Sequence, residues 1–227
     1  KLTTGMKDHR TGLVLKIFAE CGAPEDILYS AKPHIGTDML RVTIKNLRER
    51  IKSLGGEFIF GARFCDFSSS GGALDSLSFI KDGTVTRLST ENVILAVGHS
   101  ARDVFELLHE KGVTLVQKPF SVGVRMEHSQ RWLNEAMYGQ FAAHQALHAA
   151  DYKLAVHLPS GRGVYTFCMC PGGSVVAAAS EPGGVVTNGM SLYARDGENS
   201  NAAILVGIDT SDFGGEHPLA GIELQRR

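Results

Sequence analysis

The sequence predicts a fold of the α/β plus α+β class, with an α/β first part and a β-rich second part. Two observations carry this prediction. The first is an order of patterns typical of α/β proteins: helix, extended segment, hairpin, short apolar run and helix, at residues 39–54, 57–67, 73–88, 93–97 and 101–110. The second is the change after Gly112, since the chain from residue 151 onward is rich in glycine and in β-branched residues, which favours short strands joined by turns.

The composition is that of an ordinary globular protein. Of 227 residues, 43% are hydrophobic and 21% are charged, and the net charge of −1 gives no global attraction to nucleic acid or anionic lipid. No apolar run is long enough to cross a bilayer, and four cysteines without disulfide-framework spacing predict a reducing, cytoplasmic setting. Because the sequence begins at Lys1 without Met and ends within a pattern at Arg227, we expect a piece of a longer polypeptide.

The stretch from Glu91 to Asp103 organises the first part of the chain. Residues 93–97 are a continuous apolar run that predicts a buried parallel strand. Gly98 allows a sharp turn, and Ser100 with Asp103 has the spacing of a capping box for the helix that follows. A strand, a glycine turn and a helix N-terminus present backbone N–H groups to an anion or a nucleotide, although many such turns bind nothing.

Three helices are predicted before this stretch, at residues 11–20, directly after Pro24, and at 39–54 with Thr37 or Asp38 as its N-cap. The third has an apolar stripe that we expect to face the core, formed by Leu40, Ile44, Leu47, Ile51 and Leu54. Beside it runs a basic stripe of Arg41, Lys45, Arg48 and Lys52. That stripe is either a contact for a phosphate backbone or a solvated face.

The remaining elements follow from turn residues and alternation. Lys81-Asp82-Gly83 predicts a hairpin turn, because Asp-Gly tolerates positive φ. Residues 117–127 predict a strand that enters a new unit, and residues 130–149 have helical propensity. Pro171-Gly172 fits a type II turn between two strands. The strands of the last part are predicted near residues 153–158, 164–170, 175–179 and 203–208.

Several side chains are candidates for chemistry. Cys168 and Cys170 alternate on one predicted strand, so their sulfurs share a face, either as a redox or metal site or as buried residues before a turn. Arg125, Glu127 and His128 are close in sequence. Glu127 and His128 are either general acid/base residues or, with Arg125, part of an ion pair at a domain junction. Two further candidates are a metal-binding pair at helical spacing, His144 and His148, and the polar loops at residues 188–191 and 195–201.

The chain resembles a family of uncharacterised bacterial FAD-dependent dehydrogenases, which belongs to the glutathione-reductase-like superfamily of flavoproteins with two dinucleotide-binding folds. The resemblance runs along the whole chain. It is carried by Lys1-Leu-Thr-Thr4, Lys32-Pro-His-Ile-Gly-Thr-Asp38, Ile94-Leu-Ala-Val-Gly-His-Ser-Ala-Arg-Asp103, Gly123-Val-Arg-Met-Glu-His128, Phe167-Cys-Met-Cys-Pro-Gly-Gly173, Ser180-Glu181, Asn188-Gly-Met190 and Arg195-Asp-Gly-Glu-Asn199.

The resemblance implies an incomplete FAD/NAD(P)-binding (Rossmann-like) domain at residues 1–117 and a β-rich substrate or cap domain at 118–227. It implies cofactor contacts at Phe64, beside the adenine, and at Ala96, Val97, Gly98 and His99, with Val97 where such flavoproteins usually have Thr. Lys1 and Thr3 would belong to a loop that reaches toward the flavin ring. The Gly-rich βαβ fingerprint of the superfamily is missing from this sequence, which removes the main pyrophosphate site.

The sequence therefore predicts part of an FAD-dependent oxidoreductase in which the flavin carries hydride transfer, with NAD(P)H as a candidate electron donor and a small molecule as substrate. The candidate catalytic residues are His128 and Arg125, and Cys168, Cys170 and Asn188 are expected on the substrate side. The alternatives are a non-catalytic module that binds a nucleotide or nucleic acid through the basic stripe, and a metal-dependent enzyme that uses the two cysteines and nearby histidines.

Overall fold

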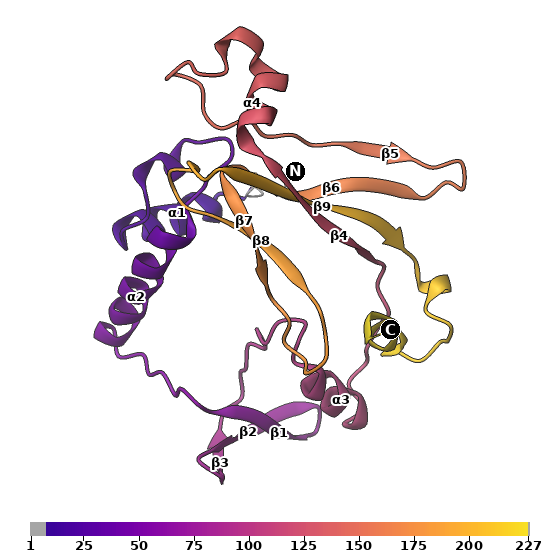
Figure 1. Ribbon diagram of the computed structural model, residues 1–227. Helices are drawn as coiled ribbons and strands as arrows, with labels where there is room; N and C mark the ends of the chain where they lie inside the picture. Colours follow the sequence, from indigo (N-terminus) through magenta and orange to yellow (C-terminus); the bar gives the residue numbers. More distant parts are fainter. Residues whose placement is uncertain (1–7, 227) are drawn as a thin grey trace. The chain divides into compact units, whose positions relative to one another are not determined.

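The computed structural model describes residues 8–226 and divides the chain into two compact units. Unit 1 consists of Lys1–Gly56, Ser121–Ala179 and Val185–Gly207. Unit 2 consists of Glu57–Phe120, Ser180–Gly184 and Ile208–Arg227. The predicted residues Lys1 and Thr3 lie outside the part of the chain that is described. Each unit is treated by itself below, and Figure 1 gives the element labels.

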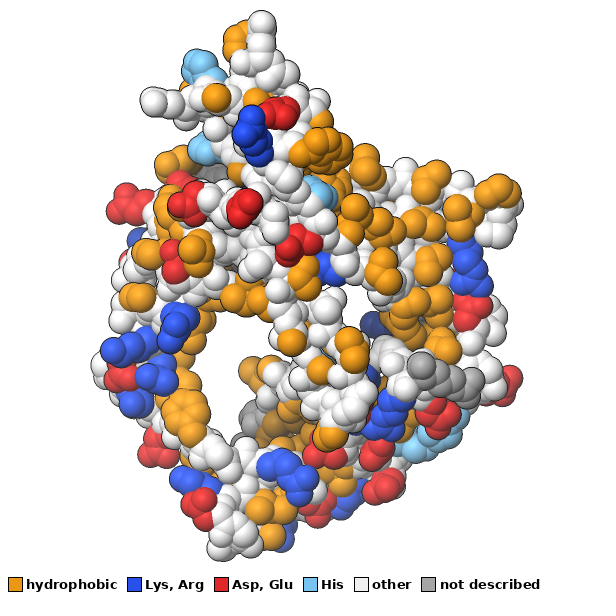
Figure 2. Space-filling view, in the orientation of Figure 1, with side chains coloured by type: hydrophobic (Ala, Val, Ile, Leu, Met, Phe, Trp, Pro, Cys, Tyr) orange, Lys and Arg blue, Asp and Glu red, His pale blue; other side chains and the backbone are white. Residues whose placement is uncertain are grey.

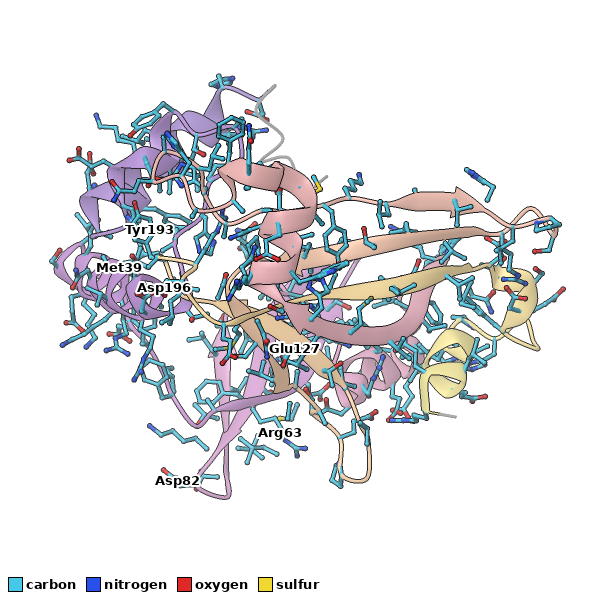
Figure 3. The ribbon with its side chains drawn as sticks, turned by 45° about the horizontal axis from the view of Figure 1, so that its top comes forward. Met39, Arg63, Asp82, Glu127, Tyr193 and Asp196 are labelled. Carbon is cyan, nitrogen blue, oxygen red and sulfur yellow. The ribbon has the colours of Figure 1, made fainter. Side chains whose placement is uncertain are left out.

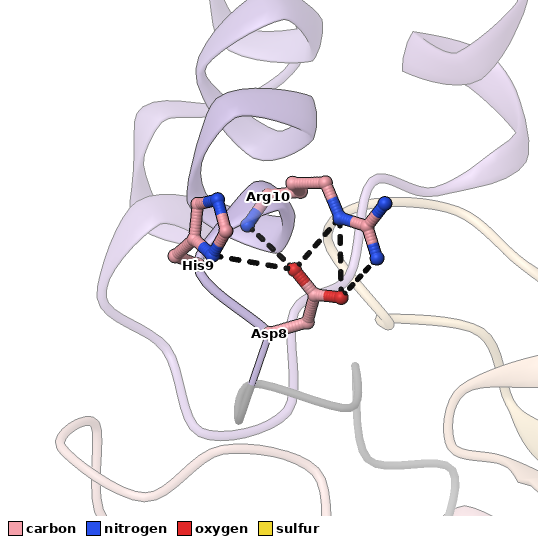
Figure 4. Close-up of polar contacts among 3 residues, drawn as sticks. All are labelled: Asp8, His9 and Arg10. Atoms are coloured by element: carbon pink, nitrogen blue, oxygen red, sulfur yellow. Dashed lines mark hydrogen bonds and ion pairs between the residues drawn. The ribbon is translucent and has the colours of Figure 1, made fainter.

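The helices of unit 1 surround a small apolar cluster. They are α1 (Arg10–Glu20), the 3-10 turn η1 (Glu25–Leu28) and α2 (Thr37–Ser53), which confirms the three helices expected here. The cluster consists of Leu15, Ala23 and the fully buried Ile27. Before α1, the exposed carboxylate of Asp8 accepts hydrogen bonds from the backbone N and the side chain of Arg10 (Figure 4), and these bonds lower the pKa of Asp8.

The apolar stripe expected to face the core from α2 is largely exposed. Leu40, Ile44 and Ile51 are 39%, 50% and 40% exposed, and Thr43 is the buried residue of the helix. The N-cap is Gly36 rather than Thr37 or Asp38. Gly36 has φ +80, and a Cβ there would overlap the backbone of Tyr193. The close approach of the segment around Tyr193 therefore requires glycine at the N-cap position. Helix propensity alone does not reveal this requirement.

The main sheet of unit 1 has the strand order β4-β9-β6-β5. β9 pairs with β6, and β6 with β5, in antiparallel fashion. The bounds are β4 (Phe120–Ser129), β5 (Ala155–His157), β6 (Gly163–Cys170) and β9 (Asn199–Ile208), which confirms the four strands expected at these places. Figure 2 shows hydrophobic side chains gathered over β4, β5 and β6, and Val122, Val124 and Val156 are among the exposed residues there.

A short helix and a hairpin complete unit 1. The helix α4 (Gln130–Tyr138) begins at Ser129, whose hydroxyl accepts a hydrogen bond from Trp132 N, and it is followed by η2 (Gly139–Phe141). Gly139, at φ 55, ends the helix well before the expected residue 149. The hairpin pairs β7 (Gly173–Ala177) with β8 (Thr187–Ser191). It follows the predicted Pro171-Gly172 turn, in which Gly172 has φ 53.

Unit 2 contains an antiparallel meander and two helices. The meander is β1 (Arg63–Ser70), β2 (Ala73–Lys81) and β3 (Thr84–Ser89). Its second turn contains Asp82 and Gly83 at positive φ, which confirms the predicted hairpin. The helices are α3 (Arg102–Glu110) and α5 (Ala220–Arg226), with η3 (Thr210–Asp212) before the latter. The rings of Phe120 and Phe213 stack at 5.3 Å between centroids and form part of the unit's core.

The predicted buried strand at residues 93–97 is wrong for the described structure. The segment has no regular secondary structure and pairs with no strand in residues 8–226 (Figure 1), and Ile94 is 93% exposed. A strand needs a neighbour to satisfy its backbone groups, and local sequence cannot supply one. The predicted capping box is wrong as well, because α3 begins after Ala101 without a side-chain cap, and Asp103 accepts instead from Val104 N.

The described chain is thus a mixed α/β structure with several antiparallel sheets, which supports the β-rich second part. Over the same residues, no helix has the length and apolarity that a bilayer-spanning segment requires.

Candidate functional site

One face of β4 carries the polar cluster on which the candidate site is built. Arg125 and Glu127 are two residues apart, so their side chains leave the strand on the same face. Arg125 Nη1 donates hydrogen bonds to Asn201 Oδ1 at 2.6 Å and to the carbonyl oxygen of Cys168 at 3.1 Å. Arg125 therefore joins β4 to β9 and to β6, and the structure brings it beside the two cysteines predicted with it.

The backbone of β8 passes directly over this guanidinium group. A Cβ on Gly189 would overlap both Arg125 Nη1 and Asn201 Oδ1, and it would lie 2.8 Å from Cys170 Sγ. Only glycine allows so close an approach of backbone to side chains. Asn188 is the neighbouring residue, and its Oδ1 accepts a hydrogen bond from Gly189 N at 2.8 Å. The predicted substrate-side residues of β6 and β8 thus come from adjacent segments.

The two cysteines lie at an irregular point of β6. Cys168 has φ 45, and the register of β6 against β9 shifts between Phe167 and Cys170. Cys170 Sγ donates to the carbonyl oxygen of Cys168 at 3.3 Å. Burial raises the pKa of both thiols, and Arg125 opposes this effect. Neutral thiols are poor nucleophiles, so the raised pKa favours two half-buried structural residues before a turn over a redox pair.

Glu127 connects three strands through its carboxylate. Oε1 accepts a hydrogen bond from Asn199 Nδ2 at 2.8 Å, and Oε2 accepts one from Val175 N at 3.1 Å. Both oxygens are therefore held by donors from β9 and β7. The sequence singled out Glu127 as an acid/base group, but its partners could not be found from spacing.

A cavity of about 350 Å³ borders this cluster at Asn199. This volume is near the lower end of the range for small-molecule pockets. Its lining contains two carboxylates, Asp196 and Glu198, and the hydroxyls of Thr37 and Ser174. Figure 3 shows Asp196 and Tyr193 near Met39 at the start of α2, and Tyr193 N donates to Asp38 Oδ1 at 3.0 Å. The other lining residues are Gly172, Gly173, Met190, Ser191, Leu192 and Gly197.

Sequence reasoning anticipated only part of this cavity. The polar loops at residues 188–191 and 195–201 were both singled out. The first supplies Met190 and Ser191, and the second supplies Asp196, Gly197, Glu198 and Asn199. The contributions of α2 and of the turn at Gly172 were missed. The contribution of α2 depends on contacts between residues more than a hundred positions apart, such as the bond between Thr37 Oγ1 and the carbonyl oxygen of Ser191. That of the turn depends on nearer contacts, such as the bond from Gly197 N to the carbonyl oxygen of Gly172.

His128 lies in different surroundings from Arg125. Its Nε2 is 2.9 Å from the hydroxyl oxygen of Tyr152, and its ring meets the ring of Trp132 at 5.9 Å between centroids. Its Nδ1 is buried without a hydrogen-bond partner in the described residues. His128 comes three positions after Arg125 on β4, so the two side chains leave by opposite faces. The structure does not bring the two candidate catalytic residues together.

The candidate cofactor residues belong to unit 2. Ala96, Val97, Gly98 and His99 form part of the exposed segment before α3, and Gly98 has the positive φ of 73 expected for a turn. Phe64 lies on β1 opposite Phe79. The structure locates these residues within unit 2. The contacts with FAD that the resemblance implies for them stay predictions.

The candidate metal pair, His144 and His148, was based on helical spacing. The two residues instead follow η2 in turns and irregular backbone. No group of three or more potential metal-ligating side chains occurs within residues 8–226. The basic stripe of α2 is solvent-accessible, and Glu49 lies within ion-pair distance of both Arg48 and Lys52. This arrangement is typical of a solvated helix face. A contact between the basic stripe and a phosphate backbone stays a prediction.

Two comparisons with known proteins bear on this site. Residues 119–227 match a family described as "FAD-dependent protein, C-terminal domain-like". Over 227 residues the chain is 47% identical to an uncharacterized protein of Clostridium beijerinckii, of which it covers 42%. The chain thus spans less than half the length of this relative. The matched segment includes β4, β6, β8 and β9, and hence Arg125, Glu127 and most of the cavity lining.

Proposed function

We propose that this chain is part of a longer FAD-dependent oxidoreductase whose substrate side is formed by unit 1. The observation that carries the proposal is the match of residues 119–227 to a domain of FAD-dependent proteins, because that segment contains the polar cluster and most of the adjoining cavity. FAD would supply the hydride chemistry. We propose NAD(P)H as electron donor and a small molecule as substrate.

The residues expected to meet FAD fit this group in part. Residues 93–98 make no backbone–backbone hydrogen bond within residues 8–226, and Gly98 allows close approach, so this segment can offer backbone N–H and C=O groups to a nucleotide. The described chain contains no glycine-rich helix N-terminus for the pyrophosphate. Ala96, Val97, Gly98, His99 and Phe64 would therefore hold FAD jointly with the rest of a longer, Rossmann-like domain.

On the substrate side, each polar residue has a distinct proposed role. Asp196, Glu198 and the hydroxyls of Thr37 and Ser174 would accept hydrogen bonds from a substrate in the cavity. Glu127 would act as a positioning residue, since its carboxylate fixes Asn199 at the cavity wall. Arg125 would hold β9 in place through Asn201. His128 and Tyr152 form a hydrogen-bonded pair that could move a proton, away from this cluster.

The test is the cofactor content of the full-length polypeptide. After purification, the protein is denatured and removed, and any released flavin is identified by absorbance and mass. We expect one FAD per polypeptide. Protein that contains no flavin, and takes up none when FAD is added, would contradict the proposal and leave a non-catalytic binding module as the better interpretation.

The role of Glu127 is tested separately on FAD-loaded protein. In Glu127→Gln an NH2 group replaces one of the two carboxylate oxygens. Because NH2 only donates, the glutamine side chain cannot accept both of the observed hydrogen bonds at separate atoms. We expect a raised KM for substrate with little change in the rate of flavin reduction at saturation. Glu135→Gln on α4 is the control, because this carboxylate is half-exposed and pairs with Arg131 on the same helix.

A further inference from the structure

Two half-buried guanidinium groups of unit 1, those of Arg125 and Arg195, form no ion pair within residues 8–226. In the same residues the Nε atom of each is buried without a hydrogen-bond partner. Arg125 donates from Nη1 to two neutral oxygens, Asn201 Oδ1 and the carbonyl oxygen of Cys168. Glu127, on the same face of β4, accepts from other donors with both of its oxygens. Two cations are therefore partly desolvated without a counter-charge, which is costly.

Asn201 adds a third donor, which is fully buried. Its side chain has 0% exposed surface, and its Nδ2 has no hydrogen-bond partner among the described residues. The orientation of this amide is determined, because Arg125 can only donate and so must face Oδ1. Buried N–H groups are nearly always paired with protein, with water or with a ligand. The unpaired Nδ2 therefore indicates a group that accepts hydrogen bonds.

Cys170 shows that these donors belong to one region of unit 1. Burial raises the pKa of its thiol, and the charges of Arg125 and Arg195 both oppose this effect. Cys170 Sγ, Arg125 Nη1 and Asn201 Oδ1 all lie against the backbone of Gly189, where an added Cβ would overlap them. Three unpaired donors thus surround the end of β6, and each comes from a different segment: β4, β9 and the loop before Asp196.

The backbone at Arg195 is held in a conformation that arginine rarely adopts. Its φ is 53, in the left-handed region. A Cβ on Gly172 would overlap the carbonyl group of Arg195, and Gly197 N donates to the carbonyl oxygen of Gly172. Two glycines therefore let the turn and the loop pack together and fix the position of Arg195. Residues kept in such conformations are concentrated at ligand sites.

We propose that Arg125, Asn201 and Arg195 form a binding site for the carboxylate or phosphate group of a small ligand other than FAD. These groups supply the negative charge that the two guanidinium groups lack, and their oxygens accept from planar N–H donors. Each unpaired donor would gain an acceptor, including the fully buried Nδ2 of Asn201. This inference goes beyond the proposed function, since it requires no flavin.

Isothermal titration calorimetry of the full-length polypeptide tests the proposal, with inorganic phosphate and acetate as probes at constant ionic strength. The first probe represents a phosphate group and the second a carboxylate. We expect at least one of them to bind with a Kd below about 5 mM. If neither probe binds at concentrations up to about 50 mM, the proposal is overturned.

Substitution of Arg195 shows whether the bound probe occupies this site. Arg195→Gln should weaken binding at least about 10-fold, because charge-assisted hydrogen bonds are lost. It should fold, since the side chain has no hydrogen-bond or ion-pair partner to lose within residues 8–226. Arg131→Gln is the matched control: this side chain is 87% exposed and pairs with Glu135 on α4. Equal losses in the two variants would show that binding follows overall charge, and would overturn the proposal.

Arg195→Lys decides the question if Arg195→Gln does not fold. The ammonium group keeps the charge but lacks the planar guanidinium donors. We expect binding of the probe to be weaker than in the unsubstituted protein but stronger than in a variant without charge. Binding as tight as in the unsubstituted protein would overturn the role of the Arg195 guanidinium group.

The same titrations, made before and after removal of bound flavin, separate this inference from the proposed function. Binding of the probe in both states is expected, because the predicted contacts with FAD lie in unit 2. Binding only after flavin removal would assign the anionic group to FAD and overturn a separate site. A polypeptide that binds the probe but never takes up FAD would contradict the proposed function and leave the anion site standing.

Discussion

Nη1 of Arg125 donates a 2.6 Å hydrogen bond to Oδ1 of Asn201, a side chain with no exposed surface. The same nitrogen donates to the carbonyl oxygen of Cys168. A single guanidinium group thus connects β4, β6 and β9 around a buried amide. Charge-assisted hydrogen bonds of this kind are stronger than neutral ones, and a buried acceptor that loses its donor is costly. The first two predictions follow from this arrangement.

Arg125→Lys should destabilise the protein although the charge is kept, because lysine lacks the planar guanidinium group whose Nη1 directs its two N–H groups at Asn201 and at Cys168. We expect the free energy of unfolding to fall by about 1–3 kcal/mol, as measured by urea denaturation. Arg131→Lys is the matched control, since the Arg131 side chain is 87% exposed and pairs with Glu135 on the same helix. Its effect should stay within about 0.5 kcal/mol. Similar losses for both variants would mean that Arg125 has no special structural role.

Gly189→Ala should force β8 away from the Arg125–Asn201 bond, because the added Cβ would overlap both side chains. Overpacking of this kind costs about 1–3 kcal/mol, and we expect a matching decrease in the free energy of unfolding. Gly207→Ala on β9 serves as control, since a Cβ there would meet no atom within 4 Å. If Gly189→Ala proves as stable as Gly207→Ala, β8 does not lie over the cluster as described.

Stability should fall as the pH falls from about 7 to about 5, in part through His34. Its Nε2 lies 3.0 Å from the carbonyl oxygen of Leu192, next to the cavity, and burial lowers the pKa of His34. The unfolded chain therefore takes up a proton at higher pH than the folded chain, so the free energy of unfolding decreases with falling pH below about 6.5.

The measurement for His34 is the free energy of unfolding at several pH values. His34→Gln should reduce the slope between pH 7 and 5, whereas replacement of the exposed His144 by Gln serves as control and should leave the slope as it is. An unchanged slope in His34→Gln would show that another group is responsible.

Alkylation should report the protonation of the thiols. Burial raises the pKa of Cys168 and Cys170, and the thiolate is the reactive form. We therefore expect iodoacetamide to modify the two cysteines slowly at pH 8 in folded protein, with a rate that rises as the pH passes about 9, and rapidly at pH 8 after denaturation. Peptide mass spectrometry identifies the sites. Rapid modification of either cysteine in folded protein at pH 8 would restore the redox interpretation.

The parts of the fold that the sequence predicted depend on local chemistry. The hairpin at Asp82-Gly83 formed where expected, because two residues at positive φ determine its turn. A strand was predicted at residues 117–127 and a helix at residues 11–20, and β4 and α1 are observed there. Each of these features is specified within about ten residues of sequence.

The features that were missed depend on residues far apart in the chain. The apolar run around Ile94 was wrongly predicted as a buried strand, because a strand requires a neighbouring strand to pair with. Gly36 replaced Thr37 as the helix cap because the backbone of Tyr193 approaches it. At the candidate site, Arg125 and the two cysteines were each named from the sequence as candidates, Arg125 as a catalytic residue and the cysteines on the substrate side. The bond of Glu127 to Asn199 and the cavity beside it were not predicted, since no spacing pattern records them.

The hydrogen bonds that Glu127 accepts have a consequence for folding during synthesis. Its two donors, Val175 and Asn199, lie 48 and 72 residues further along the chain. Contacts of such long range form late in folding, after the intervening loops have closed. During synthesis, Glu127 leaves the ribosome well before β9 exists, so the cavity wall cannot assemble until that strand emerges. A nascent chain that stalls before residue 199 would expose an unpaired β4, the kind of surface that chaperones bind.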